Sequence, residues 1–121
     1  MTTPVGPYTP VVRSGDWIIC SGQVGLGDGG LVDGGVRAEL RQAMANLSTL
    51  LESQGASLAD VVKTTVFLVD MHDYGAMNEV YVEAFEAAAP GHRPARSAVA
   101  VAALPIGAQV EIEAWARVPG A

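Results

Sequence analysis

The sequence predicts an α+β protein in which residues 1–121 form one domain, a mixed sheet of five to six strands with two helices on one face. Two observations favour this class. Two segments repeat apolar residues at helical spacing, and the other apolar runs are β-branched or alternate with a period of two. The order of these segments is β-β-α-β-α-β-β. Half of the residues are apolar and 17% are charged, as is typical of a folded chain.

The chain is expected to begin with a β-hairpin. Two β-rich runs flank Ser14, Gly15 and Asp16, and these residue types favour a tight turn. The glycine-rich stretch 27–35 follows and is expected to be a surface loop. It lacks the lysine and serine of a P-loop, so it does not indicate a phosphate site.

The first helix is expected from Val36 to the glycine at position 55, a residue that often ends helices in a left-handed conformation. Its apolar stripe consists of Val36, Leu40, Ala43, Met44, Leu47, Leu50 and Leu51. The next run, 61–69, is apolar at both odd and even positions. We therefore expect a strand that is buried on both faces.

The second helix is expected to start near Asp73, a good N-cap residue, and to end at the proline-containing stretch 90–94. Its apolar stripe consists of Tyr74, Met77, Tyr81, Ala84, Phe85 and Ala88. Strands are expected at 96–104 and 109–118. The last strand alternates strictly, with Val110, Ile112, Ala114, Ala116 and Val118 on one face and Glu111, Glu113, Trp115 and Arg117 on the other.

The layer arrangement predicts self-association. Two helices can cover only one face of a five-stranded sheet, yet the strands at 61–69 and 96–104 appear apolar on both faces. The uncovered face must therefore meet something other than water. A second copy of the same chain is the simplest candidate, because most soluble oligomers are symmetric homo-oligomers.

Charge and composition exclude several classes of function. The net charge is −6 and Lys63 is the only lysine, which argues against binding a nucleic-acid backbone. No apolar run approaches the ~20 residues of a membrane span, and no secretory signal is visible. A single cysteine, Cys20, cannot form a disulfide within the chain, which indicates a reducing cytoplasm. Because it lies in an apolar run, we expect it to be a small core residue. His72 and His92 show no ligand spacing, so no metal site is expected.

Arg96 is the first candidate for a functional residue, because a charge at the start of an apolar strand is costly unless something pairs with it. It could simply reach water or meet a carboxylate. Alternation places it with Ala98, Ala100 and Ala102, on the face expected to meet another subunit, and Pro94 restricts the entry to the strand. An arginine held in such a cleft can clamp a carboxylate with two hydrogen bonds.

Glu111 and Glu113 are the next candidates. An acid beside a guanidinium can orient a water or move a proton. They could equally be solvent-exposed residues at the edge of the sheet, which is the interpretation we prefer for Glu113. For Glu111, the spacing alone does not decide between an exposed residue and a catalytic one. The hydroxyls of Tyr8 and Ser21 lie near the ends of β segments, where ordinary hydrogen bonding would also explain them.

Five stretches of the chain together resemble a known family. In order, they read "GPYTPVV", "SGQ", "DVVKTTVFLVDMHDYGAMNEVY", "RPARSAV" and "VEIEA", and they cover about residues 4 to 118. They resemble the Rid/YjgF family of enamine/imine deaminases. The resemblance implies a chorismate-mutase-like fold and a homotrimer with active sites between subunits.

The resemblance also implies an activity, that of a 2-iminobutanoate/2-iminopropanoate deaminase. Such an enzyme hydrolyses 2-aminoacrylate or 2-imino acids to 2-keto acids and ammonia, without a cofactor or metal. The family's carboxylate-binding arginine falls on Arg96 and its water-associated glutamate on Glu111. The positions implied to bind substrate are Tyr8, Ser21, Asn78, Arg96 and the backbone near Ala98.

Two residues depart from the family pattern. Many members carry cysteine where this chain has Ala98, which puts a thiol-based switch in doubt, and many carry glutamine where it has Pro10. Two other functions remain open. One is a regulatory module that binds small carboxylates without turnover. The other is an endoribonuclease or translation inhibitor, which the acidic composition disfavours.

Overall fold

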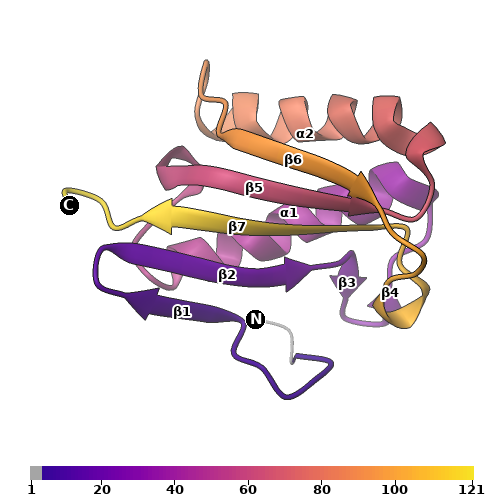
Figure 1. Cartoon of the computed structure of the whole chain (residues 1–121), viewed down its shortest axis with the longest axis horizontal. Coiled ribbons are helices and arrows are strands. Elements are labelled where there is room, and N and C mark those ends of the chain that lie inside the picture. Colours follow the sequence, from indigo (N-terminus) through magenta and orange to yellow (C-terminus); the bar gives the residue numbers. More distant parts are fainter. Residues whose placement is uncertain (1–3) are drawn as a thin grey trace.

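A computed structural model describes residues 4–121, which form a five-stranded sheet with the strand order β1-β2-β7-β5-β6. The elements are β1 (Val11–Ser14), β2 (Trp17–Gln23), α1 (Gly35–Glu52), β5 (Val61–Leu68), α2 (Tyr74–Ala88), β6 (Ala95–Ala100) and β7 (Val110–Arg117). β5 and β6 are parallel and the other neighbours are antiparallel. Both helices lie behind the sheet (Figure 1). The predicted α+β class, mixed sheet and element order are confirmed.

The turns at the start of the chain follow from short sequence signals. β1 and β2 form the expected hairpin, and Gly15 takes the left-handed conformation that its turn requires (φ 58°). The stretch predicted to be a loop is in part a second, short hairpin of β3 (Leu26–Gly27) and β4 (Gly30–Leu31). Asp28 and Gly29 occupy its two-residue turn, and Asp-Gly is a strong hairpin signal that the loop prediction overlooked.

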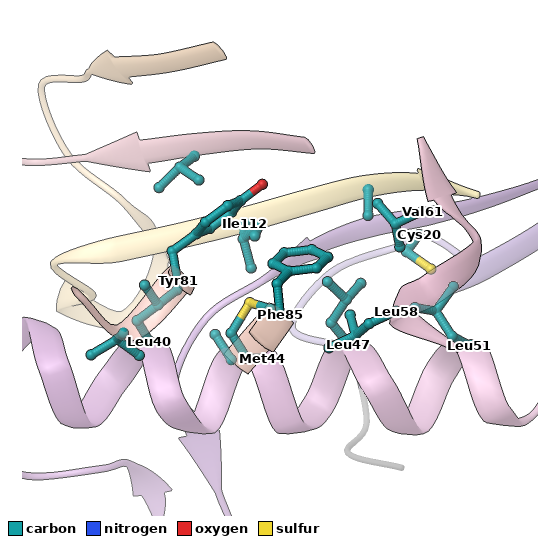
Figure 2. Packing of buried hydrophobic residues seen from close by; sticks show 14 of the residues in the cluster. Cys20, Leu40, Met44, Leu47, Leu51, Leu58, Val61, Tyr81, Phe85 and Ile112 are labelled. Carbon is teal, nitrogen blue, oxygen red and sulfur yellow. The ribbon is translucent and has the colours of Figure 1, made fainter. Parts of the chain in front are cut away.

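The core lies between the helices and one face of the sheet. All seven residues of the predicted α1 stripe are buried. On α2, Met77, Tyr81 and Phe85 are buried, whereas Tyr74 and Ala88 are exposed, so the predicted stripe is wrong at its two ends. Figure 2 shows the side chains of α1 and α2 meeting Ile112 of β7 in this layer.

The opposite face of the sheet is not covered by any described element. β7 alternates as expected, with its even-numbered residues buried against the helices. β5 does not have two buried faces in one chain, because its alternate residues are only half-buried and Val62 is exposed. Large apolar side chains lie exposed on this open face, among them Val12, Val99 and Trp115.

β6 is shorter than the predicted strand 96–104 and ends at Ala100. The amide of Val101 still donates to the carbonyl of Leu68, the last residue of β5 (2.8 Å). Beyond that point β5 offers no backbone partner, and Pro105 opens a short 3-10 turn. The length of β6 is therefore set by its neighbour in the sheet.

We expect Phe85→Ala to lower the free energy of unfolding by about 3–5 kcal/mol, because it leaves a cavity in the core. The ring of Phe85 is fully buried and its centroid lies 4.8 Å from that of Tyr81. Urea titration followed by circular dichroism measures the change. The matched control is Val82→Ala on the exposed side of the same helix, expected to cost less than about 0.5 kcal/mol. Equal losses in the two variants would contradict this packing.

Candidate functional site

The site residues predicted from the sequence lie in two separate groups. Each group also contains residues that the sequence did not indicate. The arginine cluster, at the contact of β6 with α2, consists of Arg96, Tyr74, Asn78 and Tyr81. The glutamate cluster, where the end of β2 meets β7, consists of Glu111, Gly22, Ser21 and Tyr8.

The first two turns of α2 fix the guanidinium of Arg96. Its Nη1 donates to Asn78 Oδ1 at 2.8 Å and lies 3.7 Å from Met77 Sδ. Its Nη2 donates to the hydroxyl of Tyr74 at 3.0 Å. Residues 74 and 78 face the same side of the helix because they are four positions apart. The resemblance implied a pocket role for Asn78, and the structure places it in direct contact with Arg96.

Two aromatic rings complete the surroundings of the guanidinium. Its carbon lies 4.8 Å from the ring centroid of Tyr81 and 5.6 Å from that of Tyr74, within the range of cation–π attraction. The hydroxyl of Tyr81 is itself fixed by a 2.7 Å hydrogen bond with Thr64, which is buried on β5. Burial raises the pKa of Tyr81, so its hydroxyl stays neutral beside the cation.

Arg96 is half-buried, and no carboxylate pairs with it within residues 4–121. Four other arginines do have carboxylate partners: Arg37, Arg41, Arg93 and Arg117. All the contacts of Arg96 are neutral, and three of its five N–H groups are engaged by them. A half-buried cation with two free N–H groups is well suited to accept a small anion.

Alternation with the alanines predicted that Arg96 lies on the open face of the sheet, and this prediction is wrong. Arg96 is opposite Thr64 in the parallel pairing of β5 and β6, and its side chain contacts α2. Ala98, two residues on, is partly buried against the same core. Alanine is small enough to fit either face of β6, so the alanines do not indicate which face the helices cover. The arginine nevertheless reaches the border of the sheet, because β6 is an edge strand.

Glu111 lies on the open face, opposite Phe67 of β5. Its pKa is raised above the ordinary 4.5, chiefly because burial disfavours the charged form and secondarily because of the nearby Glu113. A Cβ at Gly22 would lie 2.7 Å from its carboxyl carbon. Glycine at position 22 therefore makes room for the carboxylate, and any larger residue there would require the carboxylate end of Glu111 to move.

Ser21 and Tyr8 lie on adjoining segments beside Gly22. The amide of Ser21 donates to the carbonyl of Pro10 (2.8 Å), and its hydroxyl donates to the carbonyl of Thr9 (2.7 Å). Ser21 thus fastens the segment that carries Tyr8 to β2. The Tyr8 side chain, 44% exposed, stands at the surface. The hydroxyl of Ser21 therefore makes an ordinary hydrogen bond, as the sequence analysis allowed. Its oxygen can still accept a hydrogen bond from a ligand.

One chain does not bring the two clusters together. β5 lies between β6 and β7, so Arg96 and Glu111 are about 10 Å apart across the sheet. Their partners on β5, Thr64 and Phe67, are three residues apart, which adds about 10 Å along the strand. The two side chains also lie on opposite faces. A ligand of a few carbon atoms cannot touch both within one chain.

Sequence reasoning missed four residues of these surroundings: Tyr74, Tyr81, Thr64 and Gly22. The i, i+4, i+7 spacing of Tyr74, Asn78 and Tyr81 would have indicated a common helix face, but both tyrosines were interpreted as core. Nothing in the sequence indicates which strand residue lies beneath such a face.

The remaining candidates do not form a site. Cys20 is buried, and the loss of solvation raises the pKa of its thiol to about 11, as expected for a core residue. Nδ1 of His72 is hydrogen-bonded to Asp70, and Nε2 of His92 lies 2.7 Å from the carbonyl of Val61. Within the described part of the chain, no cluster of three metal-ligating side chains occurs, and no helix has the length and apolar character needed to span a bilayer.

Comparison with known proteins places the chain in a family. Residues 1–118 match the family model described as "Endoribonuclease L-PSP". A Mus musculus protein named "2-iminobutanoate/2-iminopropanoate deaminase" is 49% identical over 93% of this chain and 82% of its own length.

Two solved structures from E. coli also match. The YjgF gene product is 39% identical with a TM-score of 0.88, over 94% of this chain and 90% of its own. TdcF with bound serine is 34% identical with a TM-score of 0.89, over the same shares of the two chains. The chain therefore belongs to the endoribonuclease L-PSP family, which is the Rid/YjgF family that the sequence resembles.

Proposed function

We propose that the protein is a 2-iminobutanoate/2-iminopropanoate deaminase, which hydrolyses 2-imino acids and 2-aminoacrylate to 2-keto acids and ammonia. One observation carries the proposal. Within residues 4–121, the chain holds a half-buried arginine without a carboxylate partner, Arg96, and a carboxylate of raised pKa, Glu111, which are too far apart to meet within the chain. The name of the mouse relative supports the choice of reaction.

The active site in this proposal lies between subunits of a homotrimer. Arg96 is on an edge strand, and Glu111 lies on a sheet face that carries exposed apolar side chains. If that face packs against a neighbouring subunit, the arginine cluster of one subunit can reach the glutamate cluster of the next. Burial of Val12, Val99 and Trp115 would favour this assembly.

The proposed mechanism requires little from the protein because an imine carbon is already electrophilic. Arg96 binds the substrate carboxylate and aligns the imine carbon. Glu111 takes a proton from a water molecule as the water oxygen adds to the carbon of the protonated imine, giving a neutral carbinolamine. Glu111 then returns this proton to the nitrogen, and the carbon–nitrogen bond breaks. The carbinolamine hydroxyl gives up its proton to become the carbonyl of the 2-keto acid, and the departing ammonia takes up that proton. Tyr8, Ser21, Asn78 and the backbone near Ala98 line the pocket.

Arg96→Ala is expected to lower kcat/KM by about a hundredfold or more, because it removes two charge-assisted hydrogen bonds to the substrate carboxylate, each worth about 1.5–3 kcal/mol. The assay couples an amino-acid oxidase to the protein and follows the loss of imine above the uncatalysed rate. Arg93→Ala is the matched control, since Arg93 is exposed and pairs with Glu86. Undiminished imine hydrolysis in Arg96→Ala would defeat the assignment.

Mixing two inactive variants tests whether the site is shared. Arg96→Ala and Glu111→Gln chains refolded together in equal amounts are expected to regain about a quarter of wild-type activity. Each site takes its arginine from one subunit and its glutamate from the next. Half of the chains carry a normal arginine and half a normal glutamate, so about a quarter of the sites are intact. Native mass spectrometry verifies that mixed trimers form. Mixed trimers without regained activity would show that both residues act from the same chain.

The raised pKa of Glu111 sets the expected pH dependence. The carboxylate form accepts the proton, so activity should fall as the pH drops through this pKa, with a midpoint above the ordinary 4.5. Glu111→Gln should lose both rate and this acid limb while keeping its affinity for small carboxylates. An unchanged rate and pH profile in Glu111→Gln would make Glu111 a spectator.

The same variant separates the deaminase from its main alternative, a module that binds small carboxylates without turnover. That module would keep its ligand affinity in Glu111→Gln and would have no rate to lose. The structure of the E. coli relative TdcF with bound serine is compatible with either function. An endoribonuclease is the least favoured function, because the net charge is −6 and Lys63 is the only lysine. We also propose a cytoplasmic location, which the lone buried Cys20 supports.

A further inference from the structure

A cavity of about 580 Å³ lies between α1, the end of β2, the β3–β4 hairpin and the segment 4–10. Its size is typical of small-molecule pockets. It adjoins the glutamate cluster at Tyr8 and Gly22, but neither Glu111 nor any residue of the arginine cluster lines it. We call it the amide cavity, because side-chain amides supply much of its polar lining: Gln23, Gln42 and Asn46.

A chain of hydrogen bonds fixes how these amides point. Asn46 Nδ2 donates to the carbonyls of Val24 (3.2 Å) and Leu26 (2.9 Å), which can only accept. Asn46 Oδ1 must therefore be the acceptor, and Gln42 Nε2 donates to it at 2.9 Å. Gln23 Nε2 is likewise held by the carbonyl of Ser21 (3.0 Å). Within residues 4–121, no protein donor reaches the side-chain carbonyl oxygen of either glutamine.

The lining consequently offers more acceptors than donors. The hydroxyl of Thr49 donates to the carbonyl of Ala45 (3.1 Å), so toward the cavity it can only accept. Among the described residues of the lining, Asp28 at the hairpin turn is the one charged residue, and none is a lysine, arginine or histidine. An anion would meet no positive side chain among them. A cation with several N–H donors would find glutamine carbonyls, a hydroxyl and a carboxylate.

We propose that the amide cavity binds a primary ammonium group carried on a short apolar chain. The ammonium lies among the oxygens of Gln23, Gln42 and Thr49, and Asp28 contributes the attraction of its charge. The apolar chain packs on Leu26 and Leu50, which also line the cavity. The proposal does not depend on imine hydrolysis, because the side chains named here take no part in the proposed reaction, although Tyr8 and Gly22 of the glutamate cluster line the same cavity.

The experiment titrates the wild-type protein with n-butylammonium, n-butanol and butyrate at matched ionic strength, following amide shifts by NMR. Butylammonium is expected to shift the amides around Leu26 and Gln42 in a saturable way, butanol more weakly, and butyrate not at all. Failure of butylammonium to saturate these shifts would overturn the proposal, and so would equal shifts with butyrate.

Two variants test the named groups. Gln42→Leu removes the carbonyl oxygen and is expected to weaken butylammonium binding about tenfold, the effect of losing one hydrogen bond to a charged donor. Asp28→Asn changes only an exposed charge and should weaken binding about threefold at low salt. Asp33→Asn, also exposed but outside the lining, is the matched control. If both aspartate variants weakened butylammonium binding equally, the effect would come from the net charge of the protein alone. That result would contradict a specific ammonium site in the amide cavity.

Discussion

The packing of Tyr81 between β5 and Arg96 is the contact on which the arginine cluster depends. The hydroxyl of Thr64 holds the tyrosine oxygen, and the tyrosine ring in turn lies against the guanidinium. Thr64 and Tyr81 both belong to the buried layer, so the position of the charge is set by the core and not by a mobile side chain. A planar cation held in this way loses little conformational entropy on binding a carboxylate.

The separation of Arg96 from Glu111 has an electrostatic consequence. An ion pair between them would lower the pKa of the carboxyl group and occupy the guanidinium. Placing them on opposite faces of the sheet prevents that pairing within the chain and leaves Glu111 with a raised pKa. In the proposed trimer the two would approach only across a subunit boundary, where the substrate carboxylate can take up the free N–H groups first.

The sequence was sufficient for the elements whose pattern is local. The α1 stripe and the alternation of β7 follow from helical and strand periodicity, and they place Glu111 opposite the buried face before any coordinates are known. The end of β6 was not predictable in the same way, because it depends on where β5 stops. The face of Arg96 was misjudged because alanines fit a covered and an uncovered face equally well. Gly22 gave no signal, since its role is to leave space for a residue far along the chain.

The departure at Ala98 bears on regulation more than on the proposed chemistry. A methyl side chain is partly buried beside Arg96, at a position where many relatives are expected to carry cysteine. The only thiol of the chain, Cys20, is buried, and its pKa of about 11 keeps it protonated at neutral pH. Oxidants react with the thiolate, so neither position offers a redox-sensitive group near the site. A thiol-based switch beside Arg96 is therefore not expected in this protein.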